Sequence, residues 1–261
     1  MRKDLEENKN KRIGEENYNN FGTLMKIVEY NKCSDIIVEF QDEYKARVHT
    51  EYKNFKKGNV RNPYDKTLYN IGYIGNGKYK PSKNRKDTKA YKKWHKMLHR
   101  CYDPYYLNTH PTYRDCIVCE EWHNFQNFAE WFYKHYYECN GEKMCLDKDI
   151  LIKGNKIYSP NTCMIVPERI NMLFNKRQNC RGKLPIGCTF FKRDDVIMVY
   201  CDILEERKFL GQFPINRPFQ AFTCYKNYKE NYIKQVADEY KELIPQKLYE
   251  VLCKYEVEIN H

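Results

Sequence analysis

The spacing of hydrophobic residues changes twice along the chain and divides it into three regions. Short β-branched runs in FGTLMKIVEY (21–30) and DIIVEF (35–40) predict strands, and turn signals such as Asn62-Pro63 follow them. Apolar residues at helical spacing then predict amphipathic helices in KAYKKWHKMLHRCY (89–102) and EEWHNFQNFAEWFYKHYY (120–137). After a polar linker, the pattern returns to strands near residue 187.

The last region predicts a small sheet followed by helices. Three strand-like runs lie within 186–213, and the segment 218–240 predicts a long helix, with a shorter helix after it. We therefore expect an α+β fold in three modules behind a flexible tail. The expected boundaries are 1–20 for the tail, 21–76 for a small β-barrel-like module, 77–180 for a central module with aromatic helices and a basic helix, and 181–261 for a three-stranded sheet with a helix.

Positive charge is concentrated in one stretch of a chain whose formal net charge is +11. Residues 78–100 hold ten lysines and arginines and a single acid, Asp87. Such a block repels itself unless a polyanion lies beside it, although an isolated basic run can also be a solvated linker. Tyr79, Tyr91 and Trp94 lie among the lysines, and aromatic faces beside cations favour nucleic acid as the partner. The residues of this block that we expect to contact phosphates of double-stranded DNA are Lys92, Lys93, Lys96 and Arg100.

The sequence predicts a cytoplasmic protein of a bacterium or a phage-infected host cell. No apolar run approaches the roughly 20 residues that a membrane span needs, and the charged N-terminal segment lacks the apolar core of a secretory signal. The twelve cysteines are therefore expected to be thiols or metal ligands rather than disulfides.

Four of these cysteines form a possible structural zinc site. Cys116 and Cys119 have the C-x-x-C spacing of zinc ligands. Cys139, Cys145 and His110 lie in the same segment and could complete a tetrahedral set, as could Cys101 and Cys163, which we assign to it. Thiols at this spacing are also common as plain core residues. Both interpretations stay open at this point.

The segment LDKDILIKGNKIYSPNTCMIVPERIN (146–171) contains the clearest candidate chemistry. It predicts a strand, a turn, a returning strand and a helix that begins near Pro167. A carboxylate at Asp147 and an oxygen at Asn171 could then hold one Mg²⁺ or Mn²⁺ between them. The alternative is that Asp147 and Asp149 are surface acids flanking a turn.

The expected strand pair and helix resemble the HNH, or ββα-metal, nucleases, especially phage-encoded homing and restriction endonucleases. The triplet at 146–148 matches the opening of the family's motif, Asn161 or Thr162 the middle, and Asn171 the end. The resemblance implies that Asp147 and Asn171 bind the metal, that Asn161 braces the loop, and that phosphodiester bonds of DNA are hydrolysed.

The sequence departs from this family at the general base, which is a histidine in the family and Lys148 here. A lysine acts as a base only if its pKa is strongly lowered. Asp149 could orient the attacking water instead, as could Tyr158 or a histidine from another segment (His95, His99 or His123). Otherwise the chain is a non-catalytic DNA-binding protein on a degenerate scaffold, such as a regulator or a defence or counter-defence factor, or the basic helix binds RNA.

The C-terminal region resembles the plant Apetala/ethylene-response-type DNA-binding domain, which also occurs in phage homing endonucleases. The match lies in Gly187, VIMVY (196–200), KFLGQF (208–213) and the helix containing Ala221. The resemblance implies that the sheet lies in the major groove. The outward basic residues that would contact DNA are Lys192, Arg193, Arg207 and Lys208.

Overall fold

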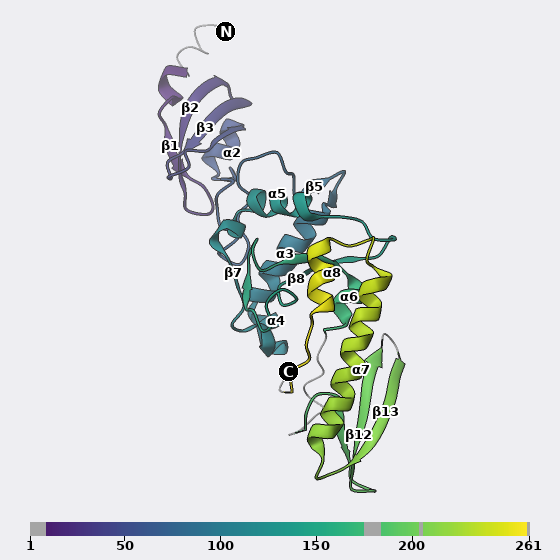
Figure 1. Ribbon diagram of the computed structural model, residues 1–261. Helices are drawn as coiled ribbons and strands as arrows, with labels where there is room; N and C mark the ends of the chain where they lie inside the picture. The colour runs from purple at the N-terminus through teal and green to yellow at the C-terminus, as the bar shows by residue number, and fades with distance from the viewer. Residues whose placement is uncertain (1–8, 175–183, 204–205, 260–261) are drawn as a thin grey trace. The chain divides into compact units, whose positions relative to one another are not determined.

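The computed structural model describes residues 9–174, 184–203 and 206–259 of the chain (Figure 1). The chain forms two compact units, one of Met1–Lys134 with Ile157–Ser159 and one of His135–Lys156 with Pro160–His261. Helices and strands occur in both units, which confirms the expected mixture of α and β structure. This division is coarser than the modules expected from the sequence, whose boundaries stay a prediction.

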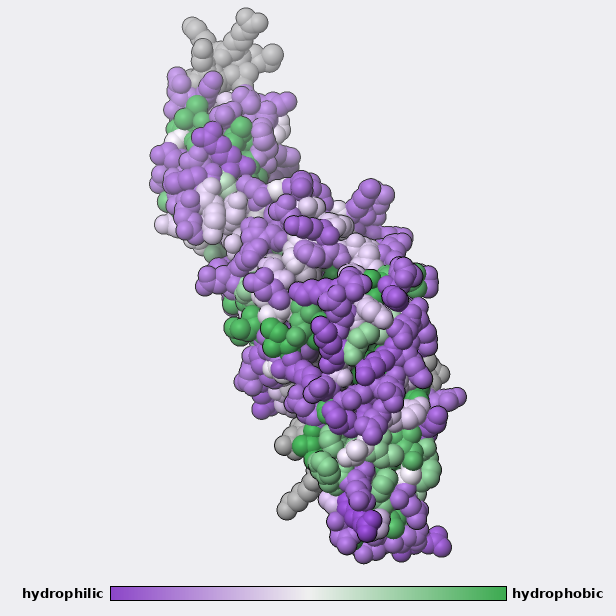
Figure 2. Space-filling view, in the orientation of Figure 1, coloured by the Kyte–Doolittle hydropathy of each residue, from purple (hydrophilic) through white to green (hydrophobic). Residues whose placement is uncertain are grey.

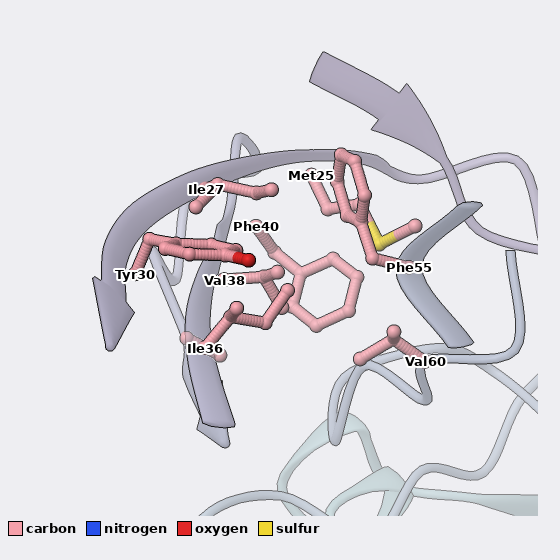
Figure 3. Close-up of a cluster of buried hydrophobic side chains, with 9 residues drawn as sticks. Met25, Ile27, Tyr30, Ile36, Val38, Phe40, Phe55 and Val60 are labelled. Carbon is pink, nitrogen blue, oxygen red and sulfur yellow. The ribbon is translucent and has the colours of Figure 1, made fainter. Parts of the chain in front are cut away.

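The first unit begins with an antiparallel sheet in the order β1-β2-β3-β4. The strands are β1 (Glu16–Tyr18), β2 (Leu24–Lys32), β3 (Asp35–Phe40) and β4 (Arg47–Thr50). Buried residues alternate along β2 and β3, and their side chains pack around Phe40 together with Phe55 of α2 (Tyr52–Lys56), as Figure 3 shows. The alternation expected for a strand with one buried face is therefore present.

Two features of this sheet differ from the sequence expectation. The sheet is open, with β1 and β4 at its edges, so the described residues do not form the barrel-like closure that we expected. β1 also lies inside the segment assigned to a flexible tail, where Tyr18 pairs with Leu24. Its residues are few and mostly exposed, so no apolar alternation marks it in the sequence. Residues 1–8 of the expected tail lie outside the described residues.

Two aromatic helices form the core of the rest of the first unit. They are α3 (Lys89–Tyr102) and α5 (Phe125–His135), and both fall where the hydrophobic periodicity placed them. Thr88 begins α3 as an N-cap, a role that suits its hydroxyl. Trp94 of α3 is fully buried and donates its indole N–H to the Trp122 carbonyl at 2.7 Å, which links α3 to the segment before α5.

Short elements complete the first unit. They are β5 (Ser82–Lys83), β6 (Lys86–Asp87), α4 (Pro104–Thr109), β7 (Ile117–Val118), β9 (Ile157–Tyr158) and two 3₁₀ turns, η1 (Pro111–Tyr113) and η2 (Glu120–His123). β5 and β6 form a hairpin, whereas β7 and β9 pair in parallel.

The described residues of the second unit form two sheets. Its elements are β8 (Met144–Asp147), β10 (Met164–Pro167), α6 (Glu168–Met172), β11 (Cys188–Phe191), β12 (Val196–Ile203), β13 (Glu206–Pro214), α7 (Pro218–Glu239) and α8 (Gln246–Cys253). β8 pairs with β10, and β11-β12-β13 form an antiparallel sheet whose buried face packs against α7. The three strands and the long helix expected between residues 186 and 240 are all present. None of the described helices combines the length and apolar character that crossing a membrane requires.

Gly187, which precedes β11, gives a test of this packing. Its φ is +78°, and an added Cβ would lie 2.1 Å from Cδ2 of Tyr225 on α7. We expect Gly187→Ala to lower the free energy of unfolding by about 2–4 kcal/mol, because the left-handed backbone and the displaced ring both cost stability.

Gly141→Ala is the matched control, since Gly141 has φ +72° and no atom within 4 Å of an added Cβ. It should cost only about 1 kcal/mol, which is the backbone contribution alone. Chemical denaturation of the two variants measures the difference. Equal losses would show that Tyr225 does not constrain this position.

Candidate metal and nucleic-acid site

The strand pair β8–β10 leads directly into α6. In the antiparallel register Asp147 lies opposite Met164, and Met144 lies opposite Pro167, the residue before α6. Residues 144–172 therefore contain a strand, a returning strand and a short helix, in the order that the sequence pattern predicted. Asp147 is the last residue of the first strand.

The Asp147 carboxylate is fixed by the backbone of the turn that follows it. Its Oδ1 accepts the N–H groups of Asp149 at 2.8 Å and Ile150 at 2.7 Å. Burial raises the pKa of the Asp147 carboxyl above its usual value, and the two N–H donors oppose that effect only in part. No hydrogen bond to Oδ2 is found within the described residues. A negative charge on this carboxylate is therefore costly in the folded chain unless a cation offsets it.

Lys148 closes the loop that begins at Asp147. Its buried ammonium donates to both oxygens of Asp149 at 2.8 Å and to the Asn155 carbonyl at 2.7 Å. The Asn155 side chain donates back to the Lys148 carbonyl at 2.8 Å. A general base must offer a lone pair, whereas this nitrogen serves as a donor to three acceptors. Asn155 was not singled out from the sequence, where only the turn signal of Gly154-Asn155 marks it.

The two asparagines of the expected motif occupy different environments. Asn161 is exposed in the turn before β10, and Asn171 is half-buried on α6. No hydrogen bond joins either side chain to Asp147 in the part of the chain that the structure describes. The structure thus places Asp147, Lys148 and Asp149 in one turn and puts both asparagines on the returning segment of the same unit.

The histidines considered as substitutes for the missing base have local partners in the first unit. Nε2 of His123 lies 3.1 Å from the Val118 carbonyl oxygen. Nδ1 of His99 lies 3.0 Å from the Tyr69 hydroxyl, and the ring of His95 lies 6.2 Å from the Tyr69 ring. Their assignment as a base stays a prediction.

The four cysteines of the possible zinc set are mostly buried. Cys101, Cys116 and Cys163 are buried and Cys119 is half-buried, and burial raises the pKa of the Cys119 thiol. Among the described residues, no group of three or more His, Cys, Asp or Glu side chains is placed to hold a metal ion. The structure leaves structural zinc as a prediction.

The expected phosphate-contacting residues of α3 divide into two kinds. Lys92 and Lys96 are exposed on the side of α3 away from the core, whereas Lys93 is half-buried. Arg100 is half-buried, and its guanidinium lies 5.6 Å from the centre of the Tyr113 ring. A hydrogen bond also links Arg100 to Tyr158. Burial raises the pKa of the Tyr158 hydroxyl, so at neutral pH less of it is ionised than of a free tyrosine.

Arg100 is as buried as Lys93, and its role as a phosphate contact stays a prediction. Arg100 lies one helical turn after Lys96 and two turns after Lys92, so it continues their row on α3. Its guanidinium packs near the Tyr113 ring, and this leaves it half-buried. A long arginine side chain commonly buries its stem in this way. The exposed members of the row are Lys92 and Lys96.

The C-terminal sheet separates two residues that we expected on one outward face. Arg207 pairs with exposed Asp202, whereas Lys208 pairs with buried Cys201. Lys208 accordingly lies 5.1 Å from the ring of Tyr228 on α7, on the helix side of the sheet. Successive side chains of a strand point to opposite faces, so adjacent Arg207 and Lys208 cannot both face away from the helix.

The face away from α7 carries aromatic residues that the sequence analysis did not single out. The Tyr200 and Phe209 rings are 5.4 Å apart, and the Arg207 guanidinium lies 4.3 Å from the Tyr200 ring. Lys192 and Arg193 are exposed in the turn between β11 and β12. Hydrophobic residues are visible on the surface around this sheet in Figure 2. Residues 196–203 alternate between the buried and the outer face of β12, and this alternation in the sequence could have identified Tyr200 as an outward residue.

Comparisons with known proteins give no assignment for this site. No family model matches the chain, and no curated protein or solved structure matches it either. The features of the chain that indicate a function are the turn at Asp147, the exposed lysines of α3 and the C-terminal sheet.

Asp147→Asn tests the electrostatic cost of the buried carboxylate. Asn keeps an oxygen for the two turn N–H groups but removes the charge. Because the folded-state pKa of Asp147 is raised, the unfolded chain loses its proton first, and wild-type stability falls as the pH rises through that window. We expect the variant to have the higher Tm at pH 7 and to lose this advantage as the pH falls below the ordinary carboxyl pKa of 3.8.

Thermal denaturation between pH 3 and pH 7, with EDTA present, measures this difference. Asp194→Asn in the exposed turn before β12 is the control and should follow the wild type at every pH. A Tm of Asp147→Asn below the wild type at pH 7 would contradict the expected cost.

Proposed function

We propose that the chain is a metal-dependent endonuclease that hydrolyses phosphodiester bonds in double-stranded DNA, of the phage homing or restriction type. The observation that supports this most is the strand–strand–helix segment at 144–172 with Asp147 at the end of its first strand. The exposed lysines of α3 supply the second support, because rows of cations suit a phosphate backbone.

Asp147 and Asn171 are the residues that would hold Mg²⁺ or Mn²⁺. The donor set fits such an ion: Mg²⁺ takes few protein oxygens, and the Asp147 carboxylate is one whose charge burial disfavours. When bound, the ion supplies charge stabilisation at the phosphorus and the leaving oxygen. Asn161 would brace the loop between the two strands.

Lys148 and Asp149 divide the remaining roles between them. Lys148 holds the Asp149 carboxylate through hydrogen bonds to both of its oxygens, which fixes the direction of that group. The Asp149 side chain is half exposed, so it can accept a hydrogen bond from the attacking water. Lys148 therefore acts as a positioning residue and Asp149 as the acceptor.

A second function is supported by a specific observation. Lys148 stands where the resembled family has its histidine base, and its nitrogen is committed as a donor to Asp149 and Asn155. A chain that keeps the scaffold and lacks a base would bind DNA without cutting it. This alternative is a regulator or a defence or counter-defence factor.

A plasmid-nicking assay with Mg²⁺ or Mn²⁺ distinguishes the two functions. We expect the wild type to relax supercoiled plasmid and EDTA to stop it. Asp147→Asn should slow nicking by about 100-fold or more while leaving a salt-sensitive gel shift, because the ligand is lost and the cations that bind phosphate remain. Asp194→Asn should nick at the wild-type rate.

Two outcomes would contradict the endonuclease. Wild-type protein that shifts duplex DNA but never nicks it supports the non-catalytic alternative. Wild-type protein that prefers single-stranded RNA supports RNA binding by the basic aromatic helix.

A further inference from the structure

The hairpin β5–β6 is an isolated two-stranded sheet at the surface of the first unit. Its turn consists of Asn84 and Arg85, with φ +52° and +60°. Positive φ at both central residues is the requirement of the type I′ turn, which joins strands through two residues. Isolated hairpins are marginal in water, and side chains other than glycine are disfavoured in this backbone region. The hairpin therefore depends on its attachment to the rest of the unit.

The charges of the hairpin are unfavourable for the free chain. Lys83 and Lys86 are direct cross-strand partners, and Arg85 lies between them at the tip. Like charges directly opposite each other destabilise a strand pair. All three side chains are exposed, and within the described residues none of them forms an ion pair with an acid. A polyanion beside the tip would remove this repulsion.

The base of the hairpin is held firmly. The Thr88 N–H donates to the Pro81 carbonyl at 2.9 Å, and Thr88 also caps α3. Gln126 of α5 accepts from the Tyr79 N–H at 3.0 Å and donates to the Tyr79 carbonyl at 3.0 Å. The Tyr79 ring is also stacked on Tyr133 at 5.4 Å. Figure 1 shows β5 projecting beside α5, and Figure 2 shows a hydrophilic surface there.

We propose that this hairpin enters the major groove of duplex DNA, with Lys83 and Lys86 on the phosphates and Arg85 directed at the base edges. The inference rests on the proposed DNA-directed function and names the element that contacts the duplex. A two-stranded ribbon fits the major groove of B-DNA, about 12 Å wide, whereas the minor groove, about 6 Å wide, is too narrow for it. The major groove of A-form RNA is deep and narrow, so a duplex of RNA is not the expected ligand.

The test compares the full chain with the double variant Lys83→Gln/Lys86→Gln on a labelled 30-bp duplex between 50 and 200 mM KCl. We expect the slope of log Kobs against log salt to decrease in magnitude by about 2, since each phosphate contact contributes about 0.9. Lys32→Gln/Lys57→Gln is the matched control, because it removes the same charge from exposed lysines elsewhere in the first unit. It should leave the slope unchanged.

Two probes locate the groove. Glucosylated hydroxymethylcytosine, which fills the major groove, should weaken wild-type binding and reduce the difference between the wild type and the double variant. The minor-groove ligand netropsin should leave both unchanged. Competition by netropsin, or stronger binding to duplex RNA than to duplex DNA, would overturn the groove assignment.

Measurements of DNA binding and of nicking together separate a failure of the hairpin proposal from a failure of the endonuclease proposal. A wild-type chain that binds and nicks DNA while the hairpin variant binds with the same slope overturns the hairpin proposal and leaves the endonuclease intact. A wild-type chain that binds no duplex DNA overturns both.

Discussion

The two backbone N–H groups that donate to Oδ1 of Asp147 are the constraint on which the candidate site depends. They end β8, orient the carboxylate and start the loop that Lys148 and Asn155 then close. These contacts would suit a simple turn, since an aspartate commonly caps the backbone that follows it. The Asp147 site differs from an ordinary turn because its carboxylate is partly buried. A negative charge on this carboxylate opposes folding unless a cation lies beside it.

The chain keeps its candidate chemistry and most of its candidate DNA contacts in different compact units. Asp147 and the strand–strand–helix segment belong to the second unit, whereas the lysines of α3 and the basic hairpin belong to the first. Contacts to phosphate supply affinity without sequence information. The second unit has a surface of another kind on its C-terminal sheet, where the aromatic rings of Tyr200 and Phe209 lie beside the Arg207 guanidinium.

The sequence predicted the elements whose signals are local. Helix α3 was identifiable from its apolar stripe, and the C-terminal strands and α7 were identifiable from alternation and periodicity. Polar β1 and the parallel pair β7–β9 were not, because strands of two or three residues show no period. The partners β7 and β9 are also far apart in sequence. The positions of Lys208 and Arg100 depended on strand register and on packing against Tyr113, which local patterns do not specify. The sequence pattern was enough to predict Asp147 as a metal ligand. It was not enough to predict the hydrogen bonds of Asp147 within its turn or the contact of Lys148 with Asp149.

Calorimetric titration of Mn²⁺ into the full chain at pH 7 measures whether the Asp147 carboxylate binds a metal ion. We expect one saturable site in the wild type that Asp147→Asn loses and that Asp194→Asn retains. Identical titration curves for the wild type and Asp147→Asn, or no binding by the wild type, would contradict a metal-binding role for this carboxylate.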